Sequence, residues 1–153
     1  VSLFRRRGFN IDSLTVGPTD MPRMSRMTLV VTGPDSIVEQ VVKQLYKIVD
    51  VIKINDVSND ETVMRELALV KVSANTTTRP EIMQLVDIFR AKIVDVANDS
   101  LIVEVTGSED KVTSLTQLLK RFGIKEMART GTVAMVRGIA AGPRLEDPEF
   151  ERK

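Results

Sequence analysis

The chain has 153 residues, 42% of them hydrophobic and 28% charged, a composition typical of one ordinary soluble domain or two small ones. It contains no cysteine and no histidine, which excludes disulfides, thiolate chemistry, imidazole acid–base catalysis and the usual zinc ligands. Its 22 basic and 21 acidic residues are spread evenly, so no part forms the positive field that attracts nucleic acid, and no apolar segment approaches the roughly 20 residues that a membrane-spanning helix needs.

The first element in chain order is the end of a helix, residues 1–8. Arg5 to Arg7 would offset the negative end of its dipole, and Gly8 would supply a left-handed cap. The next two segments, NIDSLTVG and MSRMTLVV, are predicted strands joined by a connection over residues 18–25.

A second helix begins at Ser36, which is predicted to form a capping box with Glu39. Its apolar face comprises seven residues at helical spacing: Ile37, Val38, Val41, Val42, Leu45, Ile48 and Val49. A strand over about 51–57 should follow this helix.

The second half of the chain contains a complete set of elements. The helix over 78–91 has Pro80 in its first turn and a predicted capping box formed by Thr78 and Glu81. The other predicted elements are strands over 66–74, 92–97, 100–106 and 124–129, and a helix over 109–122 that ends at Gly123. One more strand is expected over 132–137.

The chain looks like a duplication. Thr32-Gly33 aligns with Thr106-Gly107 at an offset of 74, and Leu3 aligns with Ile88 at an offset of 85. The order strand, helix, strand, strand, helix, strand predicts an α+β fold of two ferredoxin-like (βαββαβ) units. The offset places the start of the first unit before Val1, so we expect its first strand to be missing and the sequence to be a fragment.

The expected domain bounds follow from the repeat. They are a first unit over 1–57, a link over 58–65, a second unit over 66–137 and a flexible tail over 138–153. The predicted strands are aliphatic on both faces, whereas a solvated face should be more polar. We therefore expect sheet-to-sheet pairing between chains.

Few residues suggest chemistry. No glycine-rich nucleotide motif is present, and the adjacent Glu109 and Asp110 are explained by their place at a helix start. Asn10 is different, because its amide both donates and accepts hydrogen bonds and could address both charged ends of an amino acid. Alternatively, Asn10 satisfies local backbone groups after the Gly8 turn.

An RNA-binding alternative shares this fold, since RRM domains stack bases on aromatic residues of their central strands. Here the aromatic residues Phe4, Tyr46, Phe89 and Phe122 fall on predicted helices. The even charge and the aliphatic strands therefore disfavour this alternative.

Several segments are specific enough to indicate a family. LFRRRGFNIDSLTVGPTD, VVKQLYKIVDVIKI, RELALVKV, IFRAKIVDV and EMARTGTVAMVRG closely resemble successive segments of the regulatory (small) subunit of acetolactate synthase, also called acetohydroxyacid synthase. The resemblance runs from Val1 to about Gly138. It implies that the first unit is an ACT domain that binds a branched-chain amino acid, that the second is a ferredoxin-like domain, and that the chain forms a homodimer.

The resemblance also implies a cytoplasmic or plastid protein without chemistry of its own. Such a subunit activates a catalytic (large) subunit, which carries thiamine diphosphate, Mg²⁺ and FAD, and makes it sensitive to valine. The family's effector site maps to Asn10 and Ile11, with its other wall in a loop of the neighbouring subunit. Thr15, Gly17, Ser25 and Arg26 are candidate contacts to the catalytic subunit, although Ser25 and Arg26 also suit an ordinary loop-to-strand junction. A dimerisation scaffold that senses no effector is the remaining alternative.

Overall fold

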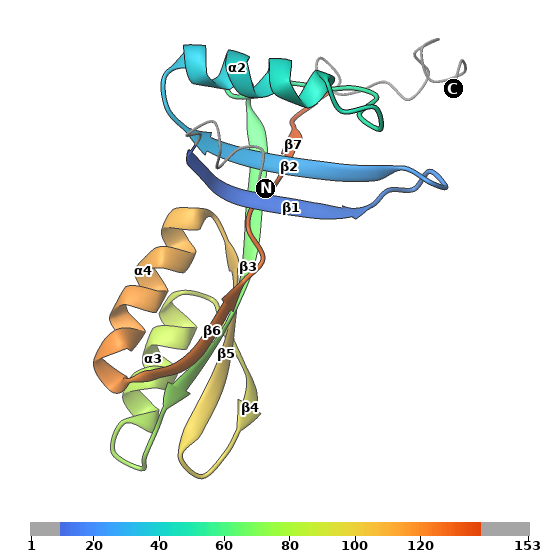
Figure 1. Ribbon diagram of the computed structural model, residues 1–153. Helices are drawn as coiled ribbons and strands as arrows, with labels where there is room; N and C mark the ends of the chain where they lie inside the picture. The colour runs from blue at the N-terminus through green and yellow to red at the C-terminus, as the bar shows by residue number, and fades with distance from the viewer. Residues whose placement is uncertain (1–9, 139–153) are drawn as a thin grey trace. The chain divides into compact units, whose positions relative to one another are not determined.

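The computed structural model describes residues 10–138 and divides the chain into two compact units (Figure 1). The first unit comprises residues up to Val63 together with the chain from Ala134 onward, and the second comprises Met64–Val133. The predicted helix end with Arg5 to Arg7 and Gly8, and the tail after Gly138, lie outside the described residues. None of the helices among residues 10–138 is long and apolar enough to cross a membrane.

The first unit contains an antiparallel hairpin of β1 (Asn10–Pro18) and β2 (Ser25–Thr32). Its pairing runs from Asn10 opposite Thr32 to Pro18 opposite Ser25, with a bulge at Asp12. Thr19 closes the turn, because its backbone N–H donates to the Met24 carbonyl at 3.1 Å and its hydroxyl accepts from the Met21 N–H. The two predicted strands and their connection are therefore confirmed.

Helix α2 (Asp35–Tyr46) packs on one face of this hairpin. Val41 and Leu45 are buried, and they contact the half-buried side chains of Ile11, Leu29, Val31 and Ile54. The predicted capping box was wrong. The helix begins at Asp35 after Pro34, so Ser36 lies inside the first turn, and no side chain caps the helix. Because the helix ends at Tyr46, Val49 is 89% exposed rather than part of the apolar face.

The strand expected over 51–57 is not formed as regular structure. An antiparallel strand requires a hydrogen-bonded neighbour, and β1 and β2 pair only with each other among the described residues. Ile54 nevertheless packs against the cluster under α2, and its carbonyl accepts a long hydrogen bond, 3.5 Å, from the Tyr46 hydroxyl.

The second unit has a four-stranded path in the order β4-β5-β3-β6, with α3 and α4 against one face (Figure 1). The elements are β3 (Thr62–Ser73), α3 (Arg79–Ile88), β4 (Lys92–Val96), β5 (Ser100–Gly107), α4 (Glu109–Leu119), the 3-10 helix η1 (Lys120–Phe122) and β6 (Ile124–Arg129). The ferredoxin-like order is confirmed.

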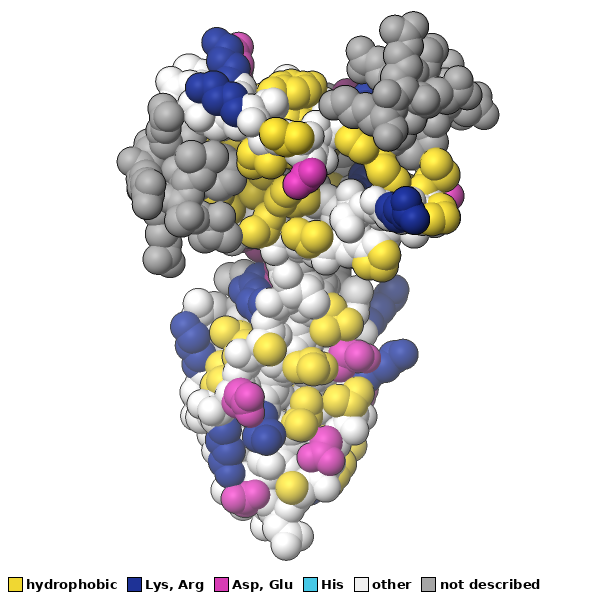
Figure 2. Space-filling view, turned by 45° about the vertical axis from the view of Figure 1, so that its right-hand side comes forward, with side chains coloured by type: hydrophobic (Ala, Val, Ile, Leu, Met, Phe, Trp, Pro, Cys, Tyr) yellow, Lys and Arg dark blue, Asp and Glu magenta, His cyan; other side chains and the backbone are white. Residues whose placement is uncertain are grey.

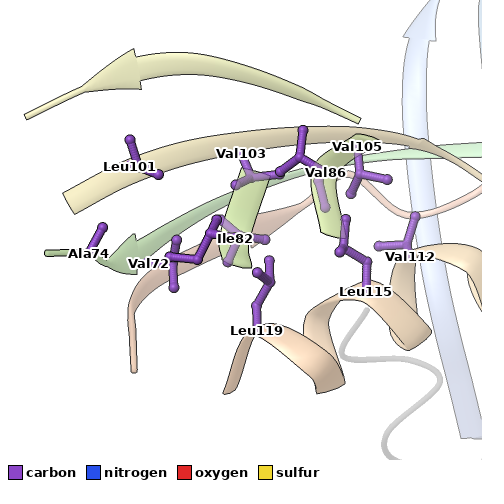
Figure 3. Close-up of a cluster of buried hydrophobic side chains, with 12 residues drawn as sticks. Val72, Ala74, Ile82, Val86, Leu101, Val103, Val105, Val112, Leu115 and Leu119 are labelled. Carbon is purple, nitrogen blue, oxygen red and sulfur yellow. The ribbon is translucent and has the colours of Figure 1, made fainter. Parts of the chain in front are cut away.

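The core of the second unit lies between the sheet and its two helices (Figure 3). Every second residue of the strands and one face of each helix contribute side chains to it. Its buried residues are Ala68, Val70, Val72 and Ala74 in and after β3, Leu101, Val103 and Val105 of β5, Ile82 and Val86 of α3, and Val112, Leu115 and Leu119 of α4. β3 and β5 pair without interruption from Glu66 opposite Gly107 to Ser73 opposite Ser100, which keeps these alternating side chains on the helix side.

The helix ends differ in part from the prediction. Ser108 caps α4 by accepting from the Lys111 N–H at 3.3 Å, and Gly123 has φ 95° just after η1, in the region that favours glycine. The capping box at Thr78 was wrong. Asn75 Oδ1 instead accepts from the backbone N–H groups of Thr77 and Thr78, both at 2.9 Å. An asparagine side chain readily bonds to backbone N–H groups two or three residues further on, which forms a turn just before the helix.

The last described strand is β7 (Val133–Val136), which pairs with β3. The strand predicted over 132–137 is confirmed, but the chain from Ala134 onward groups with the first unit by its contacts. β3 already begins at Thr62, inside the stretch predicted as a link. The Arg137 N–H donates to the Glu61 carbonyl at 2.8 Å, which extends the pairing beyond β7.

Candidate functional site

The first candidate residue, Asn10, is the exposed first residue of β1. It pairs directly with Thr32 at the end of the hairpin. The Thr32 hydroxyl donates to the carboxylate of Asp12. An amide, a hydroxyl and a carboxylate therefore lie within three residues of one strand end and its partner, a polar group suited to hydrogen bonding rather than to covalent chemistry.

The bulge at Asp12 changes how the hairpin presents its side chains. Ile11 is opposite Val31 and Ser13 is opposite Val30, so Asp12 is an extra residue in β1. Bulges redirect side chains and are frequent beside functional sites. The bulge lets Ile11 and Leu14, three residues apart, face the same side of the sheet.

The register divides the six candidate residues between two faces, because directly paired residues share a face. Asn10 pairs with Thr32, Thr15 with Thr28 and Gly17 with Arg26, so these candidates lie on the face away from α2. Ile11 and Ser25 belong to the α2 face. Ile11 packs against the α2 cluster and holds the strand beside Asn10 in place.

Gly17 has an open surrounding. A Cβ atom added at Gly17 would meet nothing within 4 Å among the described residues. Internal packing therefore does not require glycine at this position, and the strand leaves space directly opposite Arg26.

Arg26 is engaged within the first unit. Its Nη2 donates to the backbone carbonyl of Ala134 at 2.7 Å, across 108 residues of sequence. No local pattern in the sequence could indicate this contact, because nothing near position 134 marks a carbonyl as an acceptor for a distant arginine.

The α2 face of the hairpin is only partly covered by the described residues. Leu14, Val16 and Met27 lie on this face by register, and Val16 is 61% exposed. Hydrophobic side chains also gather on the side of the first unit seen in Figure 2. Among residues 10–138 no three His, Cys, Asp or Glu side chains are arranged to hold a metal ion. The hairpin thus combines a polar end with apolar surface, which suits a small amphipathic ligand or a protein partner.

Comparison with known proteins agrees across both units. Residues 1–53 match the AHAS small subunit-like ACT domain, and residues 65–138 match the family described as the small subunit of acetolactate synthase. A relative from Archaeoglobus fulgidus, named probable acetolactate synthase small subunit, is 57% identical over 136 residues, which cover 89% of this chain and 85% of the relative. The acetolactate synthase small subunit of Mycolicibacterium smegmatis is 52% identical, with 90% and 81% covered.

A solved structure is similar to this chain over most of its length. The crystal structure of the acetolactate synthase small subunit from Thermotoga maritima has a TM-score of 0.81 and 46% sequence identity, covering 90% of this chain and 86% of that one. The family resemblance seen in the sequence is thereby confirmed. The chain belongs to the acetolactate synthase small-subunit family, and its hairpin lies in the ACT domain of that family.

Proposed function

We propose that this chain is the non-catalytic regulatory subunit of an acetolactate synthase, which activates the catalytic subunit and confers feedback inhibition by valine or another branched-chain amino acid. The observation that carries this proposal is the family match over both units, in a chain whose described residues assemble no metal site and whose sequence lacks histidine and cysteine. Thiamine diphosphate, Mg²⁺ and FAD would belong to the catalytic subunit.

The proposed effector site centres on Asn10. Its exposed amide would donate to the carboxylate through its NH2 group and accept from the ammonium group of the amino acid through its oxygen, so one side chain would serve both charged ends. Ile11, packed under α2, would fix the position of Asn10. The isopropyl group of valine would occupy apolar surface supplied jointly with a second copy of the chain.

The proposal includes a homodimer formed through the same hairpin. A two-stranded sheet is marginally stable alone, and the described part of the first unit pairs β1 and β2 only with each other. Pairing with a second copy would extend the sheet and place Asn10 at a shared boundary. Effector binding at a shared site would favour one inter-subunit geometry, with a coupling free energy of typically about 1–3 kcal/mol.

Contacts to the catalytic subunit are proposed at Thr15, Gly17 and Ser25 of the hairpin. The open space at Gly17 is compatible with close approach of another backbone. Arg26 was predicted with these residues, and its Nη2 is engaged by Ala134. A location in a bacterial cytoplasm or a plastid stays a prediction.

The test is Asn10→Ala in the chain reconstituted with its catalytic subunit. We expect valine inhibition to be lost while activation is retained, because the substitution removes ligand hydrogen bonds from an exposed side chain without disturbing a core. The matched control is Asn59→Ala, which removes the same amide from an exposed loop position. Unchanged valine sensitivity would remove Asn10 from the site, and failure of the wild-type chain to assemble with the catalytic subunit would refute the proposed function.

Two alternatives make different predictions. A scaffold that senses nothing would show no thermal stabilisation by valine, leucine or isoleucine, whereas a ligand that binds only the folded state must raise its stability. An RNA-binding module would need an aromatic platform, and the described strands β1 to β7 contain no aromatic residue. Filter binding at low salt checks the second alternative.

A further inference from the structure

The hydrogen bond from Arg26 to Ala134 connects two parts of the first unit that are distant in sequence. Arg26 lies near the turn end of β2, and Ala134 is the first residue of the segment that returns to this unit after the chain has formed the second. The guanidinium Nη2 is 2.7 Å from the carbonyl oxygen of Ala134, a distance typical of a charge-assisted hydrogen bond.

Among the described residues, the returning segment, residues 134–137, is otherwise held mainly by strand pairing rather than by buried side chains. β7 pairs with β3, and the Arg137 N–H donates to the Glu61 carbonyl at 2.8 Å. Its side chains supply little burial, since Met135 is 63% exposed and Ala134 and Val136 are only half-buried. When little apolar area is buried, a single strong hydrogen bond becomes a large share of what holds a segment in place.

The position of Arg26 separates it from the proposed effector site while keeping both on one face. Arg26 pairs with Gly17, and Asn10 pairs with Thr32, at opposite ends of the hairpin. Seven residues of strand at about 3.3 Å each place Arg26 roughly 20 Å from Asn10. Arg26 is therefore outside the reach of a ligand held by Asn10, but on the same strand pair.

We propose that Arg26 is a positioning residue that fastens the returning segment, 134–137, to the β1–β2 hairpin. The chain passes between the two units at Val63–Met64 and again at Val133–Ala134. The hydrogen bond therefore links the hairpin directly to the second of these crossings. This step rests on the proposed function: a change in the conformation of the hairpin on effector binding would be transmitted through the Arg26 hydrogen bond to the crossing at Val133–Ala134.

The physical part is tested by hydrogen exchange of the full chain. In Arg26→Gln, the amides of Met135 to Arg137 should exchange about tenfold faster or more, because a hydrogen bond from a charged donor is lost. Arg23→Gln is the matched control, since it removes the same charge from the turn of the same hairpin and leaves the bond between Arg26 and Ala134 in place. Arg26→Lys, which keeps the charge and one donor, should give an intermediate rate.

Three results would overturn the fastening role: unchanged exchange in Arg26→Gln, equal acceleration in Arg23→Gln, or acceleration of the α2 and β1 amides to the same extent in Arg26→Gln. The last result would mean general loosening of the first unit. If Arg26→Gln fails to fold, the exchange rates of the same amides in Arg26→Lys and Arg23→Gln are compared with the wild-type rates. Only Arg26→Lys should exchange faster than the wild type, and equal rates in all three proteins would overturn the proposal.

The regulatory part is tested in the reconstituted complex with valine as the probe. Arg26→Gln should keep valine-induced thermal stabilisation but lose at least half of the maximal inhibition, whereas Asn10→Ala should lose both. Full inhibition in Arg26→Gln would refute the coupling. If the wild-type chain itself shows no response to valine, the proposed function fails, and the exchange experiment still decides whether Arg26 fastens the segment.

Discussion

Among single residues, Glu66 stands out because it is a charged side chain only 5% exposed in the second unit. Arg129 Nε donates to Glu66 Oε1 at 2.8 Å, and Arg129 Nη2 donates to the same oxygen. The Thr113 hydroxyl accepts from the same guanidinium at 3.2 Å. A buried charge with a forked partner is costly to leave unpaired, so this group fixes β3, β6 and α4 at one end of the sheet.

Glu66→Gln should destabilise the second unit substantially. Removing one partner of a buried ion pair costs about 3–5 kcal/mol, and we expect the lower end because the Arg129 side chain is 28% exposed. Native-state hydrogen exchange of β3 and β5 amides measures the change. The control is Glu126→Gln, which breaks the exposed Lys71–Glu126 pair at 3.8 Å and should cost no more than about 1 kcal/mol. Equal effects of the two substitutions would contradict this account.

Among elements, the turn between β4 and β5 is tied to the first residues of β6 by an exposed ion pair. Lys125 Nζ donates to Asp99 Oδ2 at 2.9 Å. This hydrogen bond and the charge of Lys125 hold the pKa of Asp99 below its ordinary value of 3.8. The Asp99 carbonyl also accepts from the Ala74 N–H at 2.9 Å, so the turn is attached to the end of β3 as well.

The sign of the pH dependence follows from the lowered pKa. A carboxyl group with a folded pKa below its unfolded value stabilises the protein above about pH 4, and this contribution is lost as the pH falls through the folded pKa. Asp99→Asn should lower the melting temperature slightly at pH 7, and the difference should vanish at lower pH and shrink in 1 M salt. Asp95→Asn on β4 is the control, because among residues 10–138 the Asp95 carboxylate forms no ion pair like that of Asp99. A difference that grew as the pH fell would refute the assignment.

The elements show what the sequence can and cannot predict. The spacing of the hydrophobic residues correctly predicted the hairpin, α2 and the elements of the second unit. It could do so because the hydrophobic face of each element packs against the hydrophobic faces of its neighbours. The capping boxes at Ser36 and Thr78 were wrong, since Pro34 and Asn75 determine those helix starts through local backbone geometry. The strand over 51–57 was wrong because strand formation depends on a partner.

The candidate site was predictable to different degrees. Asn10 was indicated by its chemistry and by the family resemblance, and its exposed position at a strand end agrees with the proposed role. The division of the candidates between two faces depends on the bulge at Asp12, which the spacing of hydrophobic residues in the sequence does not predict. The Arg26–Ala134 contact spans 108 residues, and only the tertiary structure brings the two together.

For the whole molecule, the described parts of the two units differ in the size of their hydrophobic cores. The second unit has a twelve-residue buried cluster, whereas the described cluster of the first has two buried residues, Val41 and Leu45, with four partly buried neighbours. In its described residues the first unit buries little and pairs β1 and β2 only with each other, and such a unit gains most from a partner. The homodimer proposed above should therefore stabilise the first unit and leave the stability of the second unchanged.

This difference predicts that the stability of the first unit depends on protein concentration. On hundredfold dilution, amides of β1 and β2 should exchange faster while those of β3 and β5 keep their rates, because mass action would lower the population of the proposed dimer, which forms through the first unit. Under the proposed shared site, saturating valine should restore the slow rates, because a ligand bound by two copies would favour the dimer and, at about 100 times its dissociation constant, would contribute about 2.7 kcal/mol. Hydrogen exchange at two protein concentrations, with and without valine, makes the measurement, and alanine is the control ligand. If β1 and β3 amides respond equally to dilution, the second unit also depends on the partner, and the shared site cannot be assigned to the hairpin on this ground.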